Sequence, residues 1–239
     1  MAEQAALMLH KNSSPLTQIP MGVDDSLFRD PPGPMESRSR IGIDPSCSVV
    51  LVVQSAFNED KRLETVLGAF AELDDSETLL VVVGRDDSLG CHRSRSLRRL
   101  AAGRGVSDRV IWAGQQPHSR LPLYYGAADV LVDARATSSF SSCILEAMWA
   151  SVPVVATTDS AASGTVPPDL LAGIVPTDDD ACLADALSSI LNDKRRSRAL
   201  GHAGRQWITT HGLASSIGGV VEAYEKIYKL ALDSRSQEP

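Results

Sequence analysis

The stretch SVVLVVQSAFNEDKRLETVLGAFAEL, residues 48–73, contains the smallest unit of the fold. Its first six residues form a continuous apolar run rich in β-branched side chains, which is typical of a strand buried on both faces. Its second half places Leu63, Val66 and Phe70 at spacings of three and four residues, which predicts an amphipathic helix. The stretch therefore predicts one buried strand followed by one helix that packs on it.

The same unit recurs along the chain, with short loops between its members. Further buried strands are expected at residues 78–84, 109–114, 129–134 and 152–157, with a short edge strand at 172–177. Helices are expected at residues 60–73, 94–105, 118–128, 141–151, 179–193, 194–212 and 215–232. Continuous apolar strands need helices on both faces of their sheet. The pattern thus predicts a doubly wound parallel α/β sheet, Rossmann-like, with C-terminal helices.

Composition limits the class of protein. The 239 residues are 43% hydrophobic and 22% charged, an ordinary globular balance. The formal net charge of −7 argues against general nucleic-acid binding, which needs a broad basic surface. Four widely spaced cysteines without a C-x-x-C pair argue against structural zinc and favour reduced thiols in a cytoplasmic protein. No apolar run approaches the roughly 18 residues that a membrane-spanning helix needs, so no membrane span is expected.

The chain divides into three parts by composition. Residues 1–45 are rich in Pro, Ser and Asp with little periodicity, which predicts an extended arm or connector. The regular strand–helix pattern occupies residues 46–232, which we expect to form one domain. Residues 233–239 are expected to be a disordered tail.

Polar residues just after the strands are the candidate binding residues, because ligands bind at the carboxyl ends of strands in such sheets. Lys61 follows the first strand, near a helix start where a cation is unfavourable unless an anion is bound nearby. The open alternative is a solvated surface lysine beside Glu59 and Asp60. After the second strand, Gly84 permits a close backbone approach.

Two further loops carry weaker candidates. Arg85 can either reach an anion or pair with a neighbouring aspartate, and its loop lacks the G-x-G-x-x-G pattern of dinucleotide sites. Gln115 follows the third strand and offers an amide suited to the edge of a nucleotide base. A surface turn before a helix explains Gln115 equally well.

The segment SSFSSCILEAM, residues 138–148, follows the fourth strand. Ser141 or Ser142 is placed to cap the next helix, whose first N–H groups, including that of Cys143, would then form an anion site. Glu146 lies four residues after Ser142 and shares its helix face. Glu146 is therefore a candidate acceptor of hydrogen bonds from sugar hydroxyls. The alternative is that Glu146 has no ligand and is favoured at this position only by the helix dipole.

Taken in order, these segments resemble the donor-binding half of the GT-B fold, group-1 retaining glycosyltransferases. IPMGVDDSLF is similar to that family's IPNGVD…F connector, EDKRLETVLGAFAEL to xEKGxxxLxxAFxxL, and ILEAMWASVPVVAT to xLEAMAxGxPVVAT. DRVIWAGQQP and LPLYYGAADVLVDA match in the same order, so the likeness covers nearly the whole chain. The resemblance implies the C-terminal, nucleotide-sugar-binding domain of such an enzyme.

The resemblance also implies roles for particular residues. The family's motif has two glutamates separated by seven other residues. Its second Glu, which holds the nucleotide ribose, falls on Glu146, and Phe140 is retained. The Lys that holds the donor diphosphate falls on Lys61, whereas its companion Arg falls on Ala56. The first Glu, which lies by the donor sugar, falls on Ser138.

The catalytic positions implied by the family are therefore Lys61 and Ser138, and the second lacks its carboxylate. Both motif glycines are also serines, Ser139 and Ser141. The substitution Ser138→Glu, which restores the family's glutamate, should leave nucleotide affinity nearly unchanged, because this end of the motif faces the sugar. A large change in UDP or GDP affinity would show that the loop is misaligned.

The implied activity is transfer of a hexose from a UDP- or GDP-sugar with retention of configuration, without a metal or a further cofactor. Family members also have an N-terminal acceptor domain, and the residues before the connector are too few for one. We therefore expect either a protein partner or an upstream segment to supply the acceptor domain. The alternative is a non-catalytic auxiliary or interaction subunit of a glycosyltransferase.

Overall fold

The computed structural model describes residues 23–73, 75–86, 91–137, 141–161, 166–211 and 217–235. Within them the chain forms a six-stranded sheet in the order β3-β2-β1-β4-β5-β6, and every neighbouring pair of strands is parallel. The short strand β6 lies at one edge, as the sequence predicts. The strands are β1 (Ser48–Ala56), β2 (Thr78–Arg85), β3 (Val110–Gly114), β4 (Val130–Asp133), β5 (Val154–Thr157) and β6 (Gly173–Val175).

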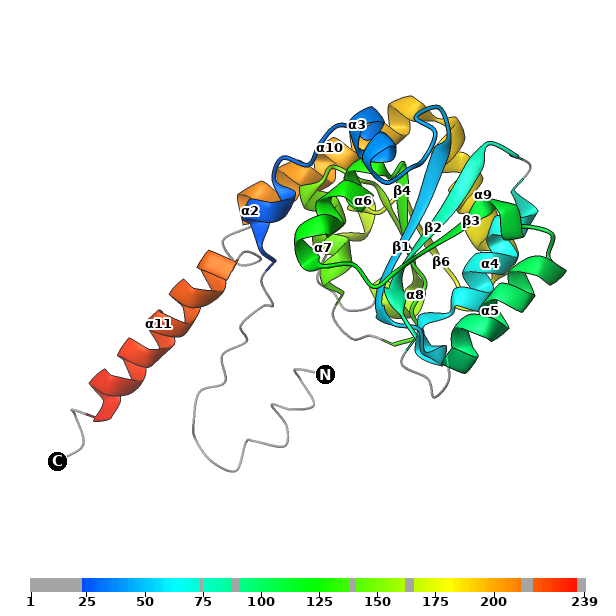
Figure 1. The fold of residues 1–239 in the computed structure, drawn as a ribbon. Helices are drawn as coiled ribbons and strands as arrows, with labels where there is room; N and C mark the ends of the chain where they lie inside the picture. Colours follow the sequence, from blue (N-terminus) through cyan, green and yellow to red (C-terminus); the bar gives the residue numbers. More distant parts are fainter. Residues whose placement is uncertain are drawn as a thin grey trace.

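Helices cover both faces of this sheet (Figure 1). One face carries α4 (Leu63–Glu72), α5 (His92–Gly103) and α9 (Asp180–Asn192). The opposite face carries α2 (Asp25–Phe28), α3 (Pro34–Arg40), α6 (Leu121–Ala127), α7 (Ser142–Trp149) and part of α10 (Lys194–His211). The short α8 (Thr158–Ala161) follows β5, and α11 (Ile217–Arg235) extends away from the body.

Alternate residues of each strand point to opposite faces of the sheet. In β1, Val50 and Val52 belong to the core beneath α4, α5 and α9, whereas Val49 and Leu51 belong to the core beneath α6 and α7. All four side chains are at most 1% exposed. The central residues of the strands are thus apolar because both faces of the sheet are buried, and the predicted doubly wound fold is confirmed.

The structure differs from the sequence expectation at both ends of the chain. In the expected extended arm, residues 25–40 form the two helices α2 and α3, and Phe28 is completely buried in the core. Hydrophobic periodicity does not reveal helices this short, because they span too few turns to show a clear period. The two helices are stabilised instead by packing, α3 against α6 and α2 against α7. At the other end α11 continues to Arg235, into the expected tail, while residues 1–22 and 236–239 lie outside the described ranges.

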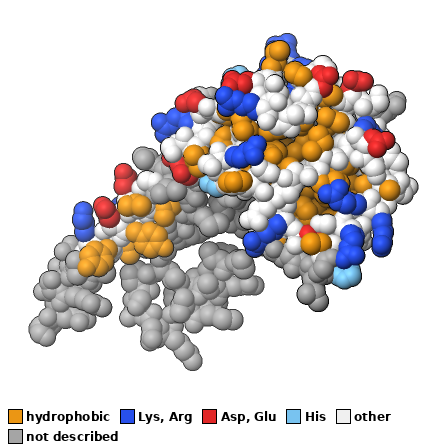
Figure 2. Space-filling view, in the orientation of Figure 1, with side chains coloured by type: hydrophobic (Ala, Val, Ile, Leu, Met, Phe, Trp, Pro, Cys, Tyr) orange, Lys and Arg blue, Asp and Glu red, His pale blue; other side chains and the backbone are white. Residues whose placement is uncertain are grey.

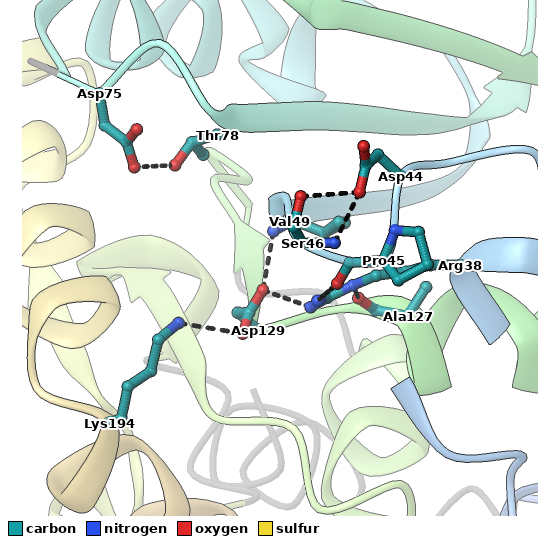
Figure 3. A network of polar contacts seen from close by, with 10 residues as sticks. All are labelled: Arg38, Asp44, Pro45, Ser46, Val49, Asp75, Thr78, Ala127, Asp129 and Lys194. Atoms are coloured by element: carbon teal, nitrogen blue, oxygen red, sulfur yellow. Dashed lines mark hydrogen bonds and ion pairs between the residues drawn. The ribbon is translucent and has the colours of Figure 1, made fainter. Parts of the chain in front are cut away.

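Arg38 joins α3 to the sheet through a buried polar network (Figure 3). Its guanidinium donates to Ala127 O at 3.0 Å, to Pro45 O at 2.9 Å and to Asp129 Oδ2 at 2.6 Å. Asp129 also accepts from the Val49 backbone N–H at 2.8 Å and pairs with Lys194 at 3.2 Å. The network lies at the amino ends of β1 and β4, on the side of the sheet away from the loops where ligands are expected.

Lys61 lies in a turn that precedes α4 and is separate from it. Arg62 adopts a left-handed conformation, with φ of 47°, so the helix expected from residue 60 starts at Leu63 instead. Glu59–Lys61 form a separate 3-10 turn that follows β1. Of the helices that the structure describes, none combines the length and the apolar character needed to cross a membrane.

Candidate functional site

The strand order reverses between β1 and β4, since β1 pairs with β2 on one side and with β4 on the other. Such a switch point opens a crevice at the carboxyl ends of the strands. A cavity of about 680 Å³ lies there, bordered by the ends of β1, β2 and β4 and by the start of α7. The volume is in the range of small-molecule sites.

The cavity collects the residues that the sequence singled out. Ser138 and Phe140 fall outside the described residues, so the structure gives no position for either. All the other predicted site residues line the cavity: Lys61, Gly84, Arg85, Gln115, Ser141, Ser142, Cys143 and Glu146. Residues from four separate strand ends therefore meet at one place, and their roles toward a ligand stay predictions.

Glu146 is a buried carboxylate in the cavity wall. Its side chain is 6% exposed, and its Oε2 accepts a hydrogen bond of 2.6 Å from the hydroxyl of the fully buried Tyr125. Oε1 lies 3.6 Å from Nε2 of the half-exposed His118. Burial and the Glu146 charge raise the pKa of Tyr125 well above its usual value, so the hydroxyl remains a donor. Tyr125 thereby fixes the orientation of the carboxylate.

Lys61 is half-buried at the cavity and is not the fully solvated surface lysine of the alternative interpretation. Among the described residues, no carboxylate forms an ion pair with it. Burial, followed by the charge of nearby Arg135, lowers the pKa of Lys61, and Asp133 partly opposes this shift. A cation in such surroundings favours the approach of an anion.

Gly84 is required by the packing of the strand ends. A Cβ at this position would lie 2.5 Å from Gln54 O and 2.7 Å from Cε1 of Phe57. The close approach expected from the sequence is thus between the ends of β1 and β2, at the cavity wall. A side chain here would push apart the ends of β1 and β2, which carry Gln54 and Arg85.

The beginning of α7 differs from the prediction in one respect. Ser141 occupies the cap position, but its side chain makes no capping hydrogen bond to the helix backbone. Its Oγ instead lies 2.7 Å from Sγ of Cys143. Burial and the charge of Asp133 raise the pKa of the Cys143 thiol, so the sulfur is neutral at physiological pH. Ser142 and Glu146 both line the cavity, as their shared helix face predicts.

Sequence reasoning did not select two charged residues of the cavity wall, Asp133 and Arg135. The side chain of Arg135 is 7% exposed, and its Nε and a terminal nitrogen donate to the two oxygens of Asp133 at 3.0 and 3.2 Å. The signal in the sequence is an aspartate at the end of an otherwise apolar strand, followed two residues later by an arginine. The polar part of the wall is completed by Gln54, Ser55, Gln116 and His118, and its apolar part is formed by Val53, Val83 and Leu121.

The fold and the cavity define a doubly wound α/β domain with a cavity at its topological switch point. Residues 36–207 match the model of the family described as glycosyl transferases, group 1. The chain belongs to this family.

Curated relatives are similar over most of this chain. The chain is 30% identical to D-inositol 3-phosphate glycosyltransferase of Nocardia farcinica, covering 86% of this chain and 46% of that protein. It is 31% identical to the GDP-mannose-dependent alpha-(1-6)-phosphatidylinositol monomannoside mannosyltransferase of Mycobacterium tuberculosis, covering 81% and 51%. The chain therefore spans about half the length of the curated relatives that it matches.

Solved structures agree with this placement. Sucrose-phosphate synthase of Thermosynechococcus elongatus superposes with a TM-score of 0.82 at 27% identity, over 97% of this chain and 57% of that one. The C-terminal domain of a group 1 glycosyl transferase of Francisella tularensis superposes with a TM-score of 0.71 at 20% identity. That superposition covers 79% of this chain and 97% of that domain, a likeness of fold.

Proposed function

We propose that the cavity binds the nucleoside diphosphate of a nucleotide sugar, and that the chain is the donor-binding half of a retaining glycosyltransferase. The observation that carries the proposal is that Glu146 and Lys61, from two separate segments of the chain, line the same cavity. A buried carboxylate suits ribose hydroxyls, and a cation with no carboxylate bound to it among the described residues suits a diphosphate.

The electrostatics support distinct tasks for the two residues. Glu146 accepts from Tyr125 through Oε2, and a carboxylate oxygen has capacity for further donors such as the hydroxyls of a ribose. Lys61 would neutralise charge that accumulates on the leaving diphosphate when the bond to the sugar breaks. Stabilising such charge in a partly desolvated site is a major source of rate enhancement.

The acceptor side of the reaction is proposed to come from an acceptor domain, either on the same polypeptide or on a partner. The chain spans about half of its curated relatives, and the cavity lies at the carboxyl edge of the sheet, where a second domain could close over it. The donor base stays open between uracil and guanine. The proposed location is the cytoplasm, where the four unbridged thiols would remain reduced.

Isothermal titration calorimetry with UDP, GDP and the matching nucleoside monophosphates tests the proposal. We expect binding of one diphosphate, weakened at least about tenfold by Glu146→Gln, because the neutral amide loses charge-assisted hydrogen bonds to the ribose. Lys226→Gln, an exposed lysine on α11, is the matched control and should bind as the wild type does. A wild-type chain that binds none of these nucleotides contradicts the proposal.

A second candidate function, a non-catalytic interaction subunit, is favoured by α11. This helix extends away from the body, and hydrophobic side chains cover part of it (Figure 1, Figure 2). Val221, Tyr224 and Tyr228 are 49%, 61% and 66% exposed, and their spacing places them on one helix face. An exposed apolar stripe of this kind is typical of a contact with another protein.

Co-purification and light scattering separate the two candidates. An interaction subunit should lose its partner when Tyr224 and Tyr228 are both changed to Ser, while its nucleotide affinity stays as in the wild type. A chain that is monomeric and partner-free in its native extract, and that binds a nucleoside diphosphate, supports the donor-binding function alone.

A further inference from the structure

The buried pair Asp133–Arg135 is a charged element of the cavity wall for which the family resemblance assigns no role. Asp133 ends β4 and Arg135 follows it, and both side chains are less than 10% exposed. Burying two charges has a large desolvation cost, which good pairing offsets only in part. A hydrophobic pair would fill the same space more cheaply, so the charges call for a use at the cavity.

The pair is connected to the turn that carries Lys61. The Ala136 backbone N–H donates to Asp60 O at 2.9 Å, which joins the loop after β4 to the 3-10 turn after β1. Thr157 Oγ1 donates to Arg135 O at 2.6 Å, and the hydroxyl of Ser160 donates to Asp133. These contacts hold the backbone of Arg135 and the side chain of Asp133, and Asp133 in turn holds the guanidinium in the cavity wall that Lys61 also lines. The charge of Arg135 lowers the pKa of Lys61.

The described residues that line the cavity carry a net positive charge, although the protein as a whole is negatively charged. Its cations are Lys61, Arg85 and Arg135, and its anions are Asp133 and Glu146, whereas the whole chain has a formal charge of −7. Lys61 and Arg135 line the same cavity, and like charges in one partly desolvated site repel each other when the site is empty. A ligand with two adjacent negative groups relieves that repulsion.

We propose that Arg135 is a second diphosphate-binding cation beside Lys61, and that Asp133 tempers its charge while the site is empty. The inference rests on the proposed function and names a further residue for it. Arg135 stands in for the arginine expected at Ala56, from a different strand of the same switch point. A guanidinium has five N–H donors in one plane, so it can donate to a phosphate oxygen while it remains paired with Asp133.

Asp133 gives the proposal an unusual consequence, because removing the aspartate's charge should strengthen diphosphate binding. Asp133→Asn keeps the shape of the side chain and an oxygen for Ser160 and Arg135, but no longer neutralises the guanidinium. A merely structural pair predicts the opposite, since loosening it would weaken the binding of every ligand. The two explanations thus differ in the sign of one measured change.

The experiment compares UDP and GDP with UMP, GMP and inorganic pyrophosphate by calorimetry, on the whole chain at two salt concentrations. Arg135→Gln should lower diphosphate affinity roughly 10- to 100-fold and monophosphate affinity much less, and should reduce the salt dependence of diphosphate binding. Asp133→Asn should raise diphosphate affinity severalfold. The double variant Asp133→Asn/Arg135→Gln, which buries no unpaired charge, should bind diphosphates as weakly as Arg135→Gln, and thermal unfolding checks that each variant is folded.

Each outcome bears on one of the two proposals. Equal losses for mono- and diphosphates in Arg135→Gln, or weaker diphosphate binding in Asp133→Asn, would overturn the role of Arg135 while leaving nucleotide binding intact. Pyrophosphate binding that depends on Arg135, without any preference for nucleotides, would retain the anion site and contradict the proposed function. A wild-type chain that binds neither nucleotides nor pyrophosphate would overturn both.

Discussion

At the scale of single residues, Lys61 carries its charge in surroundings that oppose it. Burial and Arg135 lower its pKa, so the charged form costs stability at neutral pH, and this cost fades as the pH rises through the folded-state pKa toward the ordinary value. A charged residue that lowers the stability of the folded protein often has a binding role. The same conflict makes opposite changes in stability and affinity measurable in one variant.

Lys61→Met should stabilise the empty protein and weaken nucleotide binding. Methionine fills the half-buried volume without the charge, so the melting temperature at pH 7 should rise relative to the wild type. Diphosphate affinity should fall at least about tenfold, because a charge-assisted contact is lost. Differential scanning calorimetry and titration with UDP and GDP measure the two effects, and a variant that is less stable yet binds normally would contradict this account.

Tyr125 should make stability depend on alkaline pH. Tyr125→Phe deprives a buried carboxylate oxygen of its donor and should lower the free energy of unfolding at pH 7 by about 1–3 kcal/mol. Because the folded-state pKa of Tyr125 is raised, the hydroxyl's contribution is complete below the ordinary tyrosine pKa of about 10 and is lost as the pH rises beyond it.

The difference in unfolding free energy between wild type and Tyr125→Phe should therefore shrink above about pH 10. Urea unfolding at neutral and alkaline pH measures it. Tyr228→Phe, at a side chain 66% exposed, is the control and should show neither the loss nor the pH dependence. A constant difference across this range would show that Tyr125 does not titrate with folding.

At the scale of elements, helix contacts depend on glycines that the sequence pattern does not distinguish. Gly201 lies in α10, where a Cβ would come within 2.1 Å of the backbone oxygen of Ser151. Gly103 ends α5, and a Cβ there would meet no atom within 4 Å. Both are glycines within expected helices, so only their neighbours tell them apart.

Gly201→Ala should therefore destabilise the protein and Gly103→Ala should not. The first forces α10 away from the turn after α7 and should cost about 1–3 kcal/mol of unfolding free energy. The second adds a better helix former at an open position and should contribute up to about 1 kcal/mol of stability. Chemical denaturation of both variants measures the contrast, and similar effects at the two positions would contradict the close packing of α10 on Ser151.

The boundaries of elements were the least predictable part of the fold. The helix after β1 was expected from residue 60 but starts at Leu63, the first residue of its apolar period, because Arg62 has a left-handed backbone conformation. Of the two serines expected to cap α7, Ser141 occupies the cap position, but its hydroxyl contacts Cys143 and makes no capping bond. Such details depend on competing partners that are distant in sequence or invisible to periodicity.

At the scale of the whole molecule, Arg38 connects the N-terminal helices to the sheet. Arg38→Met removes three hydrogen bonds to Ala127, Pro45 and Asp129 and leaves a partly buried aspartate with weaker pairing. The unfolding free energy should fall by about 3–5 kcal/mol. Arg40, on the same helix, pairs with Glu36 at the surface with both side chains more than half exposed.

Arg40→Met is the matched control and should change stability by less than about 0.5 kcal/mol. Thermal and urea unfolding of the two variants compare a buried with an exposed arginine on one helix. Hydrogen exchange of α3 and α6 should rise in Arg38→Met only. Equal stability of the two variants would show that residues 23–45 are not an integral part of the folded unit.

Residue types and their order were enough to predict the layers of the fold and the edge of the sheet where the candidate site lies. Apolar strands of β-branched residues require cover on both faces, which dictates a doubly wound sheet, and parallel strands bring their following loops to one edge. Lys61, Gly84, Gln115 and Glu146 were selected for that reason and meet at the cavity. Only the tertiary structure decided that Tyr125 holds Glu146 and that Asp133 and Arg135 lie beside Lys61. Those contacts join side chains from different strands and helices, and one chain's periodicity carries no record of which distant residues face each other.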